Sequence, residues 1–274
     1  MDLKTLLEQR FGAAHLEPSD DIDPNIARIL GRRTCRRYAP RPVEAHALDL
    51  LIATALSASA KSDFQQASIL KVRDAAKRAA IGSFFPTMPF IATSPEFLVF
   101  CADPRRLEQI CTRRGHPAPQ RDLEAFLNSS VDAALLMQTF ILAAEAIGLG
   151  CCPISVIRNR VRSIAPILEL PPGVFPVSGL CLGYPADKGY VSMRLPPSVT
   201  VHLDRYDDSK AAREIAAYDR RREDRFPTHK EKQRNPAKFG YANAYGWSED
   251  KARQAAEPEG QEFAEHVRET WFTL

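Results

Sequence analysis

The chain has 274 residues, of which 45% are hydrophobic and 26% are charged, and its formal net charge is +3. These values are close to the averages of folded globular proteins and exclude fibrous and disordered classes. The small net charge excludes a global attraction to nucleic acid, so any basic function must be local. No apolar run approaches the roughly 20 residues of a bilayer span, and residues 1–8 lack the pattern of a secretory signal, so we expect a cytoplasmic protein.

The first part of the chain is predicted to be mainly helical. Residues 2–11 place leucines at helical spacing, and residues 24–30 follow an Asp23 cap and end at Gly31. Residues 43–58 carry apolar side chains three and four positions apart, which indicates a helix buried on one face.

An arginine-rich run, residues 31–40, separates the second and third of these helices. Arginine forks bind phosphate bidentately, and the Thr34 hydroxyl can donate to a further phosphate oxygen. The side chains from Arg32 to Tyr38 alternate as on a strand, so the run can present two different faces. A solvated charged loop is the alternative that the run alone leaves open.

Residues 57–66 are predicted to form a loop between the third helix and an apolar strand at residues 68–72. The small, amide and acidic side chains of this loop suit it to lie along a flat polar ring and to hydrogen-bond the ring's edge. A plain connector is the alternative.

The central part of the chain predicts one buried strand and one long helix. Residues 95–103 indicate the strand, because their apolar residues run without alternation until Asp103. Residues 123–147 carry an apolar stripe wide enough for a central or subunit-interface helix. A further helix is predicted at residues 74–83, and residues 113–121 are predicted to be a polar connection.

The last part of the chain becomes polar. Residues 151–155 and 174–183 predict extended segments, and residues 211–225 predict a basic helix. Because there is neither an internal repeat nor a clear linker, we expect residues 1–274 to form a single domain with a polar, basic C-terminal extension from about residue 205.

The six cysteines do not predict a metal site or disulfides. Cys111 with His116 is the closest approach to a ligand pair, and two further ligands would have to come from elsewhere. Disulfides are rare in cytosolic proteins. We interpret the adjacent Cys151 and Cys152 as packing residues rather than catalysts.

Five motifs in this order resemble the FMN-dependent nitroreductase superfamily. They are Arg32 to Tyr38, Ser62 to Gln65, the glycines at 148 and 150, residues 179–185, and residues 194–196. Within the superfamily, the likeness is strongest to the bacterial NADPH-dependent oxygen-insensitive nitroreductases and flavin reductases, whose buried strand resembles residues 96–103. The likeness covers about residues 20–205.

The resemblance implies an α+β, nitroreductase-like fold with a central, mostly antiparallel sheet flanked by helices. It also implies an intertwined homodimer with two FMN molecules at the subunit interface. The implied activity is transfer of a hydride from NADPH or NADH through flavin to nitroaromatic, quinone or flavin acceptors by a ping-pong mechanism. The N5 atom of the flavin carries this chemistry, so no catalytic side chain and no metal are expected.

The resemblance also implies roles for individual residues. The expected cofactor-binding residues are Arg32, Arg33, Thr34, Arg36, Ser62, Asp63, Gln65, Pro153, Ile154, Ser155 and Arg194. The residues expected on the substrate side are Phe64 and Arg158. The phosphate group is assigned to the arginines and the ring edge to Ser62, Asp63 and Gln65.

Four positions depart from the family pattern. Ser155 with Val156 replaces a glycine pair beside the ring, Ser192 replaces a lysine, and Met88 replaces a glutamine. Asp63 adds a carboxylate near the ring edge, which disfavours an anionic reduced flavin unless the carboxylate is paired or protonated.

Two other functions remain open from the sequence. A protein of this fold can use FMN for another reaction, such as reductive dehalogenation or flavin breakdown. A nucleic-acid-binding function would need aromatic partners among the basic residues, and these are not interleaved with them. The basic residues of the C-terminal part either contact the 2′-phosphate of NADPH or form a solvated surface; they are Arg220, Arg221, Arg222, Arg225, Lys230, Lys232 and Arg234.

Overall fold

The computed structural model describes residues 2–13 and 22–274. The chain groups into two compact units. The larger unit contains Arg33–Gly189 and Gly260–Leu274, and the smaller contains Met1–Arg32 and Tyr190–Glu259. The expectation of one domain with a basic extension from about residue 205 stays a prediction.

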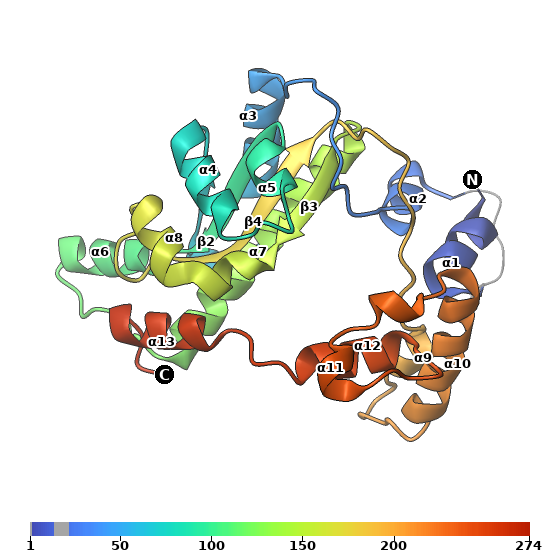
Figure 1. Cartoon of the computed structure of the whole chain (residues 1–274). Helices are drawn as coiled ribbons and strands as arrows, with labels where there is room; N and C mark the ends of the chain where they lie inside the picture. The colour runs from blue at the N-terminus through green and yellow to red at the C-terminus, as the bar shows by residue number, and fades with distance from the viewer. Residues whose placement is uncertain (1, 14–21) are drawn as a thin grey trace. The chain divides into compact units, whose positions relative to one another are not determined.

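An antiparallel sheet forms the centre of the larger unit (Figure 1). In the described residues it has four strands in the order β1-β2-β4-β3. The strands are β1 (Ala67–Lys71), β2 (Glu96–Ala102), β3 (Gly150–Ile154) and β4 (Phe175–Gly183). The predicted α+β fold with a mostly antiparallel sheet is therefore confirmed.

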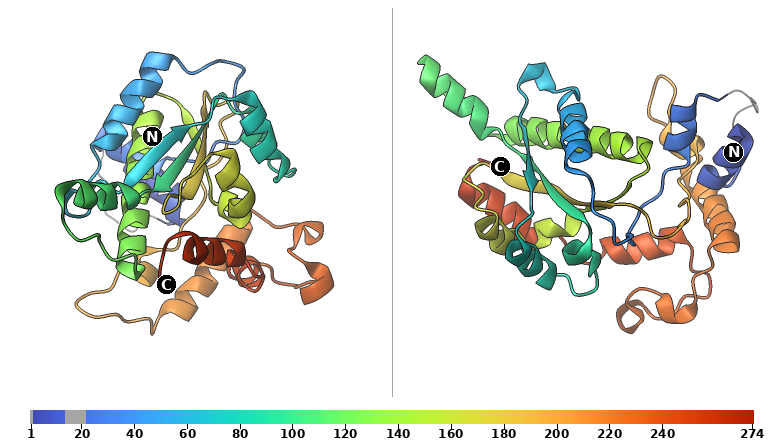
Figure 2. Two further views of the ribbon diagram at one scale, coloured as in Figure 1. Left: turned by 90° about the vertical axis from the view of Figure 1, so that its left-hand side faces the viewer. Right: turned by 90° about the horizontal axis from the view of Figure 1, so that it is seen from above.

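Helices cover both faces of this sheet (Figure 2). Leu98 and Phe100 of β2 pack with α3 (Ala45–Leu56) and α7 (Leu123–Ala146) on one face. The alternate residues Phe97 and Val99 pack on the other face, against α4 (Ala75–Ser83), α5 (Phe90–Thr93) and α8 (Val161–Ile167). Because successive side chains of a strand point to opposite faces, a strand covered on both sides has the continuous apolar sequence seen here.

The long helix α7 is buried along one side only. Phe140 and Ile141 belong to the core, whereas Val131 and Leu135 are exposed. Among the described residues, α7 is the single helix that is long and apolar enough to cross a membrane by length and composition, a test that core helices of soluble proteins also pass.

The sequence-based prediction missed several helices of the larger unit, including two of ten residues each. α6 (Arg105–Arg114) follows β2 directly, and α13 (Gln261–Thr270) lies near the end of the chain. Phe272, which follows α13 in the chain, contacts Phe126 and Phe175 edge to face, with ring centroids 5.5 Å apart in both pairs. The C-terminal residues thus complete the core where β4 begins.

The smaller unit is helical in its described residues. Its N-terminal helices are α1 (Leu3–Phe11) and α2 (Pro24–Leu30). The basic helix α10 (Ala211–Arg225) has the predicted bounds, and α12 (Trp247–Ala255) packs on it through Tyr218 and Trp247. The short elements of this unit are α9 (Pro197–Thr200), η3 (Lys230–Lys232) and α11 (Pro236–Phe239).

A substitution at Gly150 tests the packing at the start of β3. A Cβ atom there would lie 2.6 Å from Cys35 Cβ and 2.7 Å from Cys35 Sγ. We expect Gly150→Ala to lower the free energy of unfolding by about 1–3 kcal/mol, because the side chain overpacks a buried site. Denaturant titration measures this. In the control Gly31→Ala, the added Cβ would be 3.3 Å from the nearest atom. This variant should lose less free energy of unfolding than Gly150→Ala. An equal loss would contradict overpacking as the cause.

Candidate functional site

The arginine segment, residues 32–38, is joined to the sheet beside β3. The Cys35 N–H donates to the Cys151 carbonyl at 2.9 Å, and Tyr38 bridges to Pro185 just after β4. The expectation of a strand-like run is wrong, since Tyr38 is the only bridging residue in this described segment. The reason is Pro153 on the edge strand β3. Proline lacks an N–H group, so hydrogen-bonded strand pairing does not extend past it.

Tyr38 anchors the end of this segment. Its hydroxyl lies 2.7 Å from the Cys35 carbonyl oxygen and 3.1 Å from the Cys181 carbonyl oxygen. Burial raises the pKa of the Tyr38 hydroxyl, so it stays protonated and able to donate. The backbone of the segment is therefore held while its charged side chains point outward.

The guanidiniums of Arg33, Arg36 and Arg37 lie along this edge. Arg33 donates to the Asp187 carbonyl oxygen at 2.6 Å, and Arg37 forms an ion pair with the Asp187 carboxylate at 3.5 Å. Arg36 is exposed and lies beside Cys152. Burial raises the pKa of the Cys152 thiol to about 11, with the Arg36 charge opposing that shift. Of these three guanidiniums, only Arg37 pairs with a carboxylate in the part of the chain that the structure describes, so the edge is positive.

The predicted flavin-side residues follow at the end of β3. Pro153 and Ser155 are exposed, whereas the Ile154 side chain is buried in the core. Ile154 as a whole is 3% exposed, so it presents almost no surface to a ligand and its expected role stays a prediction. Ser155 also starts the short helix η2 (Ser155–Arg160).

Arg158 of η2 is engaged within the protein. Its guanidinium donates to the Val177 carbonyl oxygen and lies 5.8 Å from the ring centroid of Phe263. These contacts tie η2 to β4 and α13. The structure thus gives Arg158 a packing role, and its expected role on the substrate side stays a prediction.

The 62–65 loop has an unusual backbone. Ser62, Asp63 and Gln65 have φ angles of 49°, 57° and 52°. Each is in the left-handed region, which costs a residue other than glycine about 1–2 kcal/mol. The Gln65 amide donates to the Asp63 carboxylate at 3.0 Å, and Phe64 is 43% exposed. The sequence did not indicate this strain, because none of the four residues is glycine.

Two charged side chains hold the loop from outside. Asp132 of α7, which is 3% exposed, accepts from the backbone N–H groups of Lys61 and Gln66. Arg106 of α6 donates to the Gln65 carbonyl oxygen at 2.5 Å. Neither residue was predicted for the site. An acidic residue within the apolar stripe of a long helix is the sequence signal that could have indicated Asp132.

The arginine segment and the 62–65 loop lie at opposite corners of the sheet. The segment contacts the outer edge of β3 where β4 ends, whereas the loop precedes β1 where β4 begins. β4 has nine residues, so its ends are about 26 Å apart, and the three strand spacings between the edge strands add about 14 Å. This diagonal exceeds the length of one FMN molecule.

Two predicted residues belong to the smaller unit. Arg10, which is 6% exposed, donates to the carbonyl oxygens of Leu30, Arg32 and Ser192 at 2.5–3.0 Å. The Arg10 carbonyl oxygen accepts from the Arg194 N–H at 2.7 Å. Arg10 therefore brings the backbones of Arg32 and Arg194 close together, although it was not predicted for the site.

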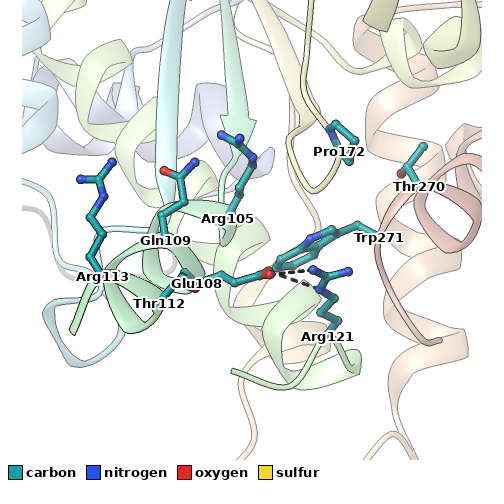
Figure 3. Close-up of a pocket in the computed structure, with 9 residues that line it drawn as sticks. All are labelled: Arg105, Glu108, Gln109, Thr112, Arg113, Arg121, Pro172, Thr270 and Trp271. Carbon is teal, nitrogen blue, oxygen red and sulfur yellow. Dashed lines mark hydrogen bonds and ion pairs between the residues drawn. The ribbon is translucent and has the colours of Figure 1, made fainter. Parts of the chain in front are cut away.

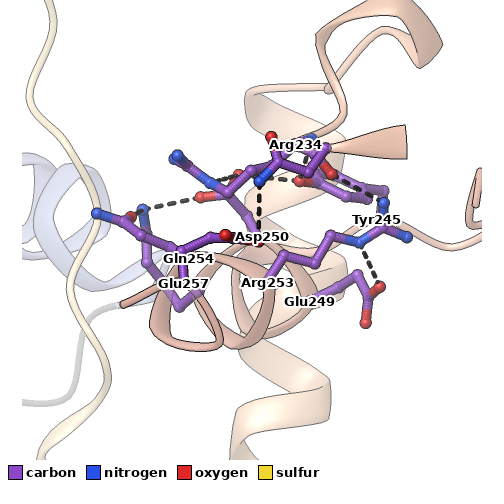
Figure 4. Close-up of polar contacts among 9 residues, drawn as sticks. Arg234, Tyr245, Glu249, Asp250, Arg253, Gln254 and Glu257 are labelled. Carbon is purple, nitrogen blue, oxygen red and sulfur yellow. Dashed lines mark hydrogen bonds and ion pairs between the residues drawn. The ribbon is translucent and has the colours of Figure 1, made fainter. Parts of the chain in front are cut away.

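Some of the C-terminal cations are engaged in internal contacts. Arg253, which is 3% exposed, donates to the carbonyl oxygens of Arg234 and Gly240 and pairs with Glu249 at 2.7 Å (Figure 4). Arg234 in turn lies 3.4 Å from the Asp250 carboxylate. Arg225 donates to backbone carbonyls of α1. Arg220, Lys230 and Lys232 are exposed.

A cavity of about 490 Å³ lies away from all the predicted residues (Figure 3). One side is formed by Arg105, Gln109 and Arg113 of α6, and the opposite side includes Trp271. Arg121 pairs with Glu108 at 2.6 Å, below the indole. A second cavity, of about 450 Å³, is lined by Gln65, Arg106 and Asp132 together with apolar residues of α3, α7 and β1.

Comparisons with known proteins cover most of the chain. The Nitroreductase family matches residues 29–184, and the Nitroreductase family, C-terminal domain, matches residues 192–274. An oxygen-insensitive NADPH nitroreductase of Salmonella typhimurium is 34% identical over 83% of this chain and 99% of that protein. An FMN reductase [NAD(P)H] of Bacillus subtilis is also 34% identical, over 71% of this chain and 79% of its own length.

Solved protein structures also resemble this chain over most of its length. NfrA2 of B. megaterium has a TM-score of 0.82 at 28% identity, covering 92% of this chain and 99% of its own. The NADPH:FMN oxidoreductase from Vibrio harveyi complexed with NAD+ has a TM-score of 0.78 at 26% identity, covering 90% of this chain and 98% of its own.

Arg10 gives a test of the smaller unit. Arg10→Met keeps the length of the side chain but removes the donors to partly buried carbonyl groups. We expect a loss of about 1–3 kcal/mol in the free energy of unfolding, measured by urea titration of the flavin-free protein. The exposed Arg194→Met should change this free energy by less than about 0.5 kcal/mol. Equal values for both variants would argue against the central position of Arg10.

Proposed function

This chain belongs to the Nitroreductase family, and we propose that it is an FMN-dependent NAD(P)H oxidoreductase of the nitroreductase and flavin reductase type. The likeness to an NADPH nitroreductase over nearly that protein's whole length supports this proposal. We also propose a cytoplasmic location. Its support is that all six cysteines are free thiols, a state that reducing compartments maintain.

The donor chemistry of the chain fits FMN. Arg33 and Arg36 offer guanidinium forks to the phosphate, with Thr34 as a hydroxyl donor beside them. The exposed surface of Pro153 and Ser155 continues from this edge and suits one side of a flat ring. Ser62, Asp63 and Gln65 carry groups that can hydrogen-bond the polar edge of the ring. Arg32 and Arg194 are assigned to the phosphate by the family resemblance.

We propose that each FMN site is shared by the two subunits of a homodimer. The supporting observation is the diagonal separation of the arginine segment and the 62–65 loop, since one FMN molecule cannot reach both within one chain. α7 offers a surface for the dimer: Leu123, Leu127, Val131 and Leu135 form a stripe at four-residue spacing, with exposed fractions of 42–66%. Such a stripe, left open, marks an interface.

The bound FMN would supply the redox chemistry, by accepting a hydride from NAD(P)H and passing two electrons to an acceptor. The residues of the chain bind, orient and tune the cofactor. The guanidiniums of Arg33 and Arg36 favour negative charge on it. The hydrogen bond from Gln65 to Asp63 partly offsets the carboxylate near the ring edge.

The proposed acceptors are nitroaromatics, quinones and free flavins. Such flat molecules suit a single open slot that NAD(P)H occupies first and leaves before the acceptor binds, which is a ping-pong order. The bulk of Ser155 and Val156 narrows this slot relative to a glycine pair. For NADPH, we propose Arg220, Lys230 and Lys232 as contacts of the 2′-phosphate, because Arg225 and Arg234 are engaged within the protein.

The visible absorption spectrum tests the proposed activity. We expect a yellow protein that bleaches anaerobically with NADPH and regains colour with a nitroaromatic, a quinone or added flavin. A yellow protein that bleaches but ignores these acceptors would indicate another flavin reaction, such as reductive dehalogenation or flavin breakdown. A colourless protein that takes up no FMN would contradict the proposal, and salt-sensitive retention on DNA would then indicate a nucleic-acid-binding protein.

Subunit mixing tests the shared site. Arg36→Ala breaks the phosphate half, and Ser62→Ala with Gln65→Ala breaks the ring half, so each variant alone should bind FMN poorly. When the two variants are co-expressed with different tags, the purified heterodimer contains one intact site and one doubly broken site. We expect FMN occupancy near half of wild type in the heterodimer.

The matched control is a heterodimer of wild-type subunits carrying the same two tags, which should be fully occupied. If both halves of a site came from one subunit, mixing would restore no FMN, and the shared site would be wrong.

A further inference from the structure

We propose that Asp132 of α7 is a positioning residue that holds the 62–65 loop in its flavin-binding form, with Arg106 of α6 as its counterpart. The inference rests on the proposed function, since that function assigns this loop to the ring edge. Neither side chain is among the residues that the family resemblance assigned to FMN.

Asp132 closes the loop at both ends. One carboxylate oxygen accepts from the Lys61 N–H at 2.9 Å, and the other accepts from the Gln66 N–H at 3.0 Å. The four loop residues lie between these two bonds. Because Asp132 is 3% exposed, water cannot readily replace it as the acceptor, and its loss would leave the Gln66 N–H buried without a partner.

Arg106 binds the same segment through its carbonyl groups, whereas Asp132 binds its N–H groups. It donates to the carbonyl oxygens of Gln65 at 2.5 Å and of Ala67 at 3.2 Å. It also donates to the Ser68 hydroxyl at 2.7 Å and pairs with Asp103 at 2.9 Å. An anion thus binds N–H groups of the loop and its flank, and a cation binds their carbonyl groups.

The loop needs such support because its own side chains contribute little beyond the hydrogen bond from Gln65 to Asp63. Lys61 and the four residues of the loop are all exposed, so packing contributes little to their conformation. Three of the four are in the left-handed region without being glycine. Backbone strain of this kind persists only where the surroundings over-determine the conformation.

The position of Asp132 on α7 connects the loop to the proposed subunit interface. Asp132 follows Val131, which belongs to the exposed apolar stripe, and it faces the loop while Val131 faces solvent. One turn of α7 therefore carries both the clamp and part of the proposed interface. Contacts across the dimer and the placement of the loop would be set by the same helix.

The test compares three variants by FMN titration of the apoprotein, followed by quenching of flavin fluorescence. Asp132→Asn keeps the shape but turns an amide NH₂ toward one of the two donors. Arg106→Met removes the donors to the loop carbonyls. We expect Asp132→Asn to weaken FMN binding by about tenfold, the effect of one unsatisfied buried group, and the Arg106 variant to weaken it less because Arg106 is exposed. Hydrogen exchange of residues 61–66 should accelerate in Asp132→Asn.

The control is Asp122→Ala. Asp122 caps the same helix by accepting from the Ala125 N–H at 3.0 Å, away from the loop. This variant should lower the melting temperature while its FMN affinity stays within about twofold of wild type. A general destabilisation of α7 would instead weaken FMN binding in Asp122→Ala as well, and that result would overturn the positioning role.

The remaining outcomes separate the two proposals. If wild type binds FMN and Asp132→Asn binds it equally well, the clamp is wrong and the proposed function stands. If the wild-type apoprotein takes up no FMN, the proposed function fails, and the clamp's role in flavin binding fails with it.

Discussion

The antiparallel sheet imposes the main constraint on this protein. Its register puts the arginine segment beside the end of β4 and the 62–65 loop beside the start of β4, on opposite edges. Neither group can move toward the other without breaking strand pairing. A ligand that needs both a cationic phosphate site and a polar ring edge would therefore have to be completed by a second copy, which is why we propose that flavin binding depends on assembly.

The two halves of the proposed site are supported by the same physical means. In each half, hydrogen bonds to the backbone fix the chain while exposed side chains remain available. Cys35 and Tyr38 hold the arginine segment through carbonyl groups of the sheet. Asp132 and Arg106 hold the 62–65 loop through its N–H and carbonyl groups. These contacts to the backbone thus pre-organise polar groups that would otherwise lose affinity to conformational entropy.

Local patterns were sufficient to predict much of the fold, whereas non-local contacts were not. The unbroken apolar run of β2 and the wide stripe of α7 follow from burial on two faces and on one face, and both elements are found. α13 was missed because its narrow apolar face, Phe263 and Val267, is set among charged residues. Asp132 became meaningful only when folding brought it to the ends of a loop about 70 positions earlier.

A crystal structure of the protein with FMN bound tests the shared site most directly. We expect the phosphate group within hydrogen-bond distance of Arg33 or Arg36 in one protomer. We also expect the polar edge of the ring against residues 62–65 of the partner subunit. An FMN molecule whose phosphate and ring edge are both held by a single protomer would contradict the account.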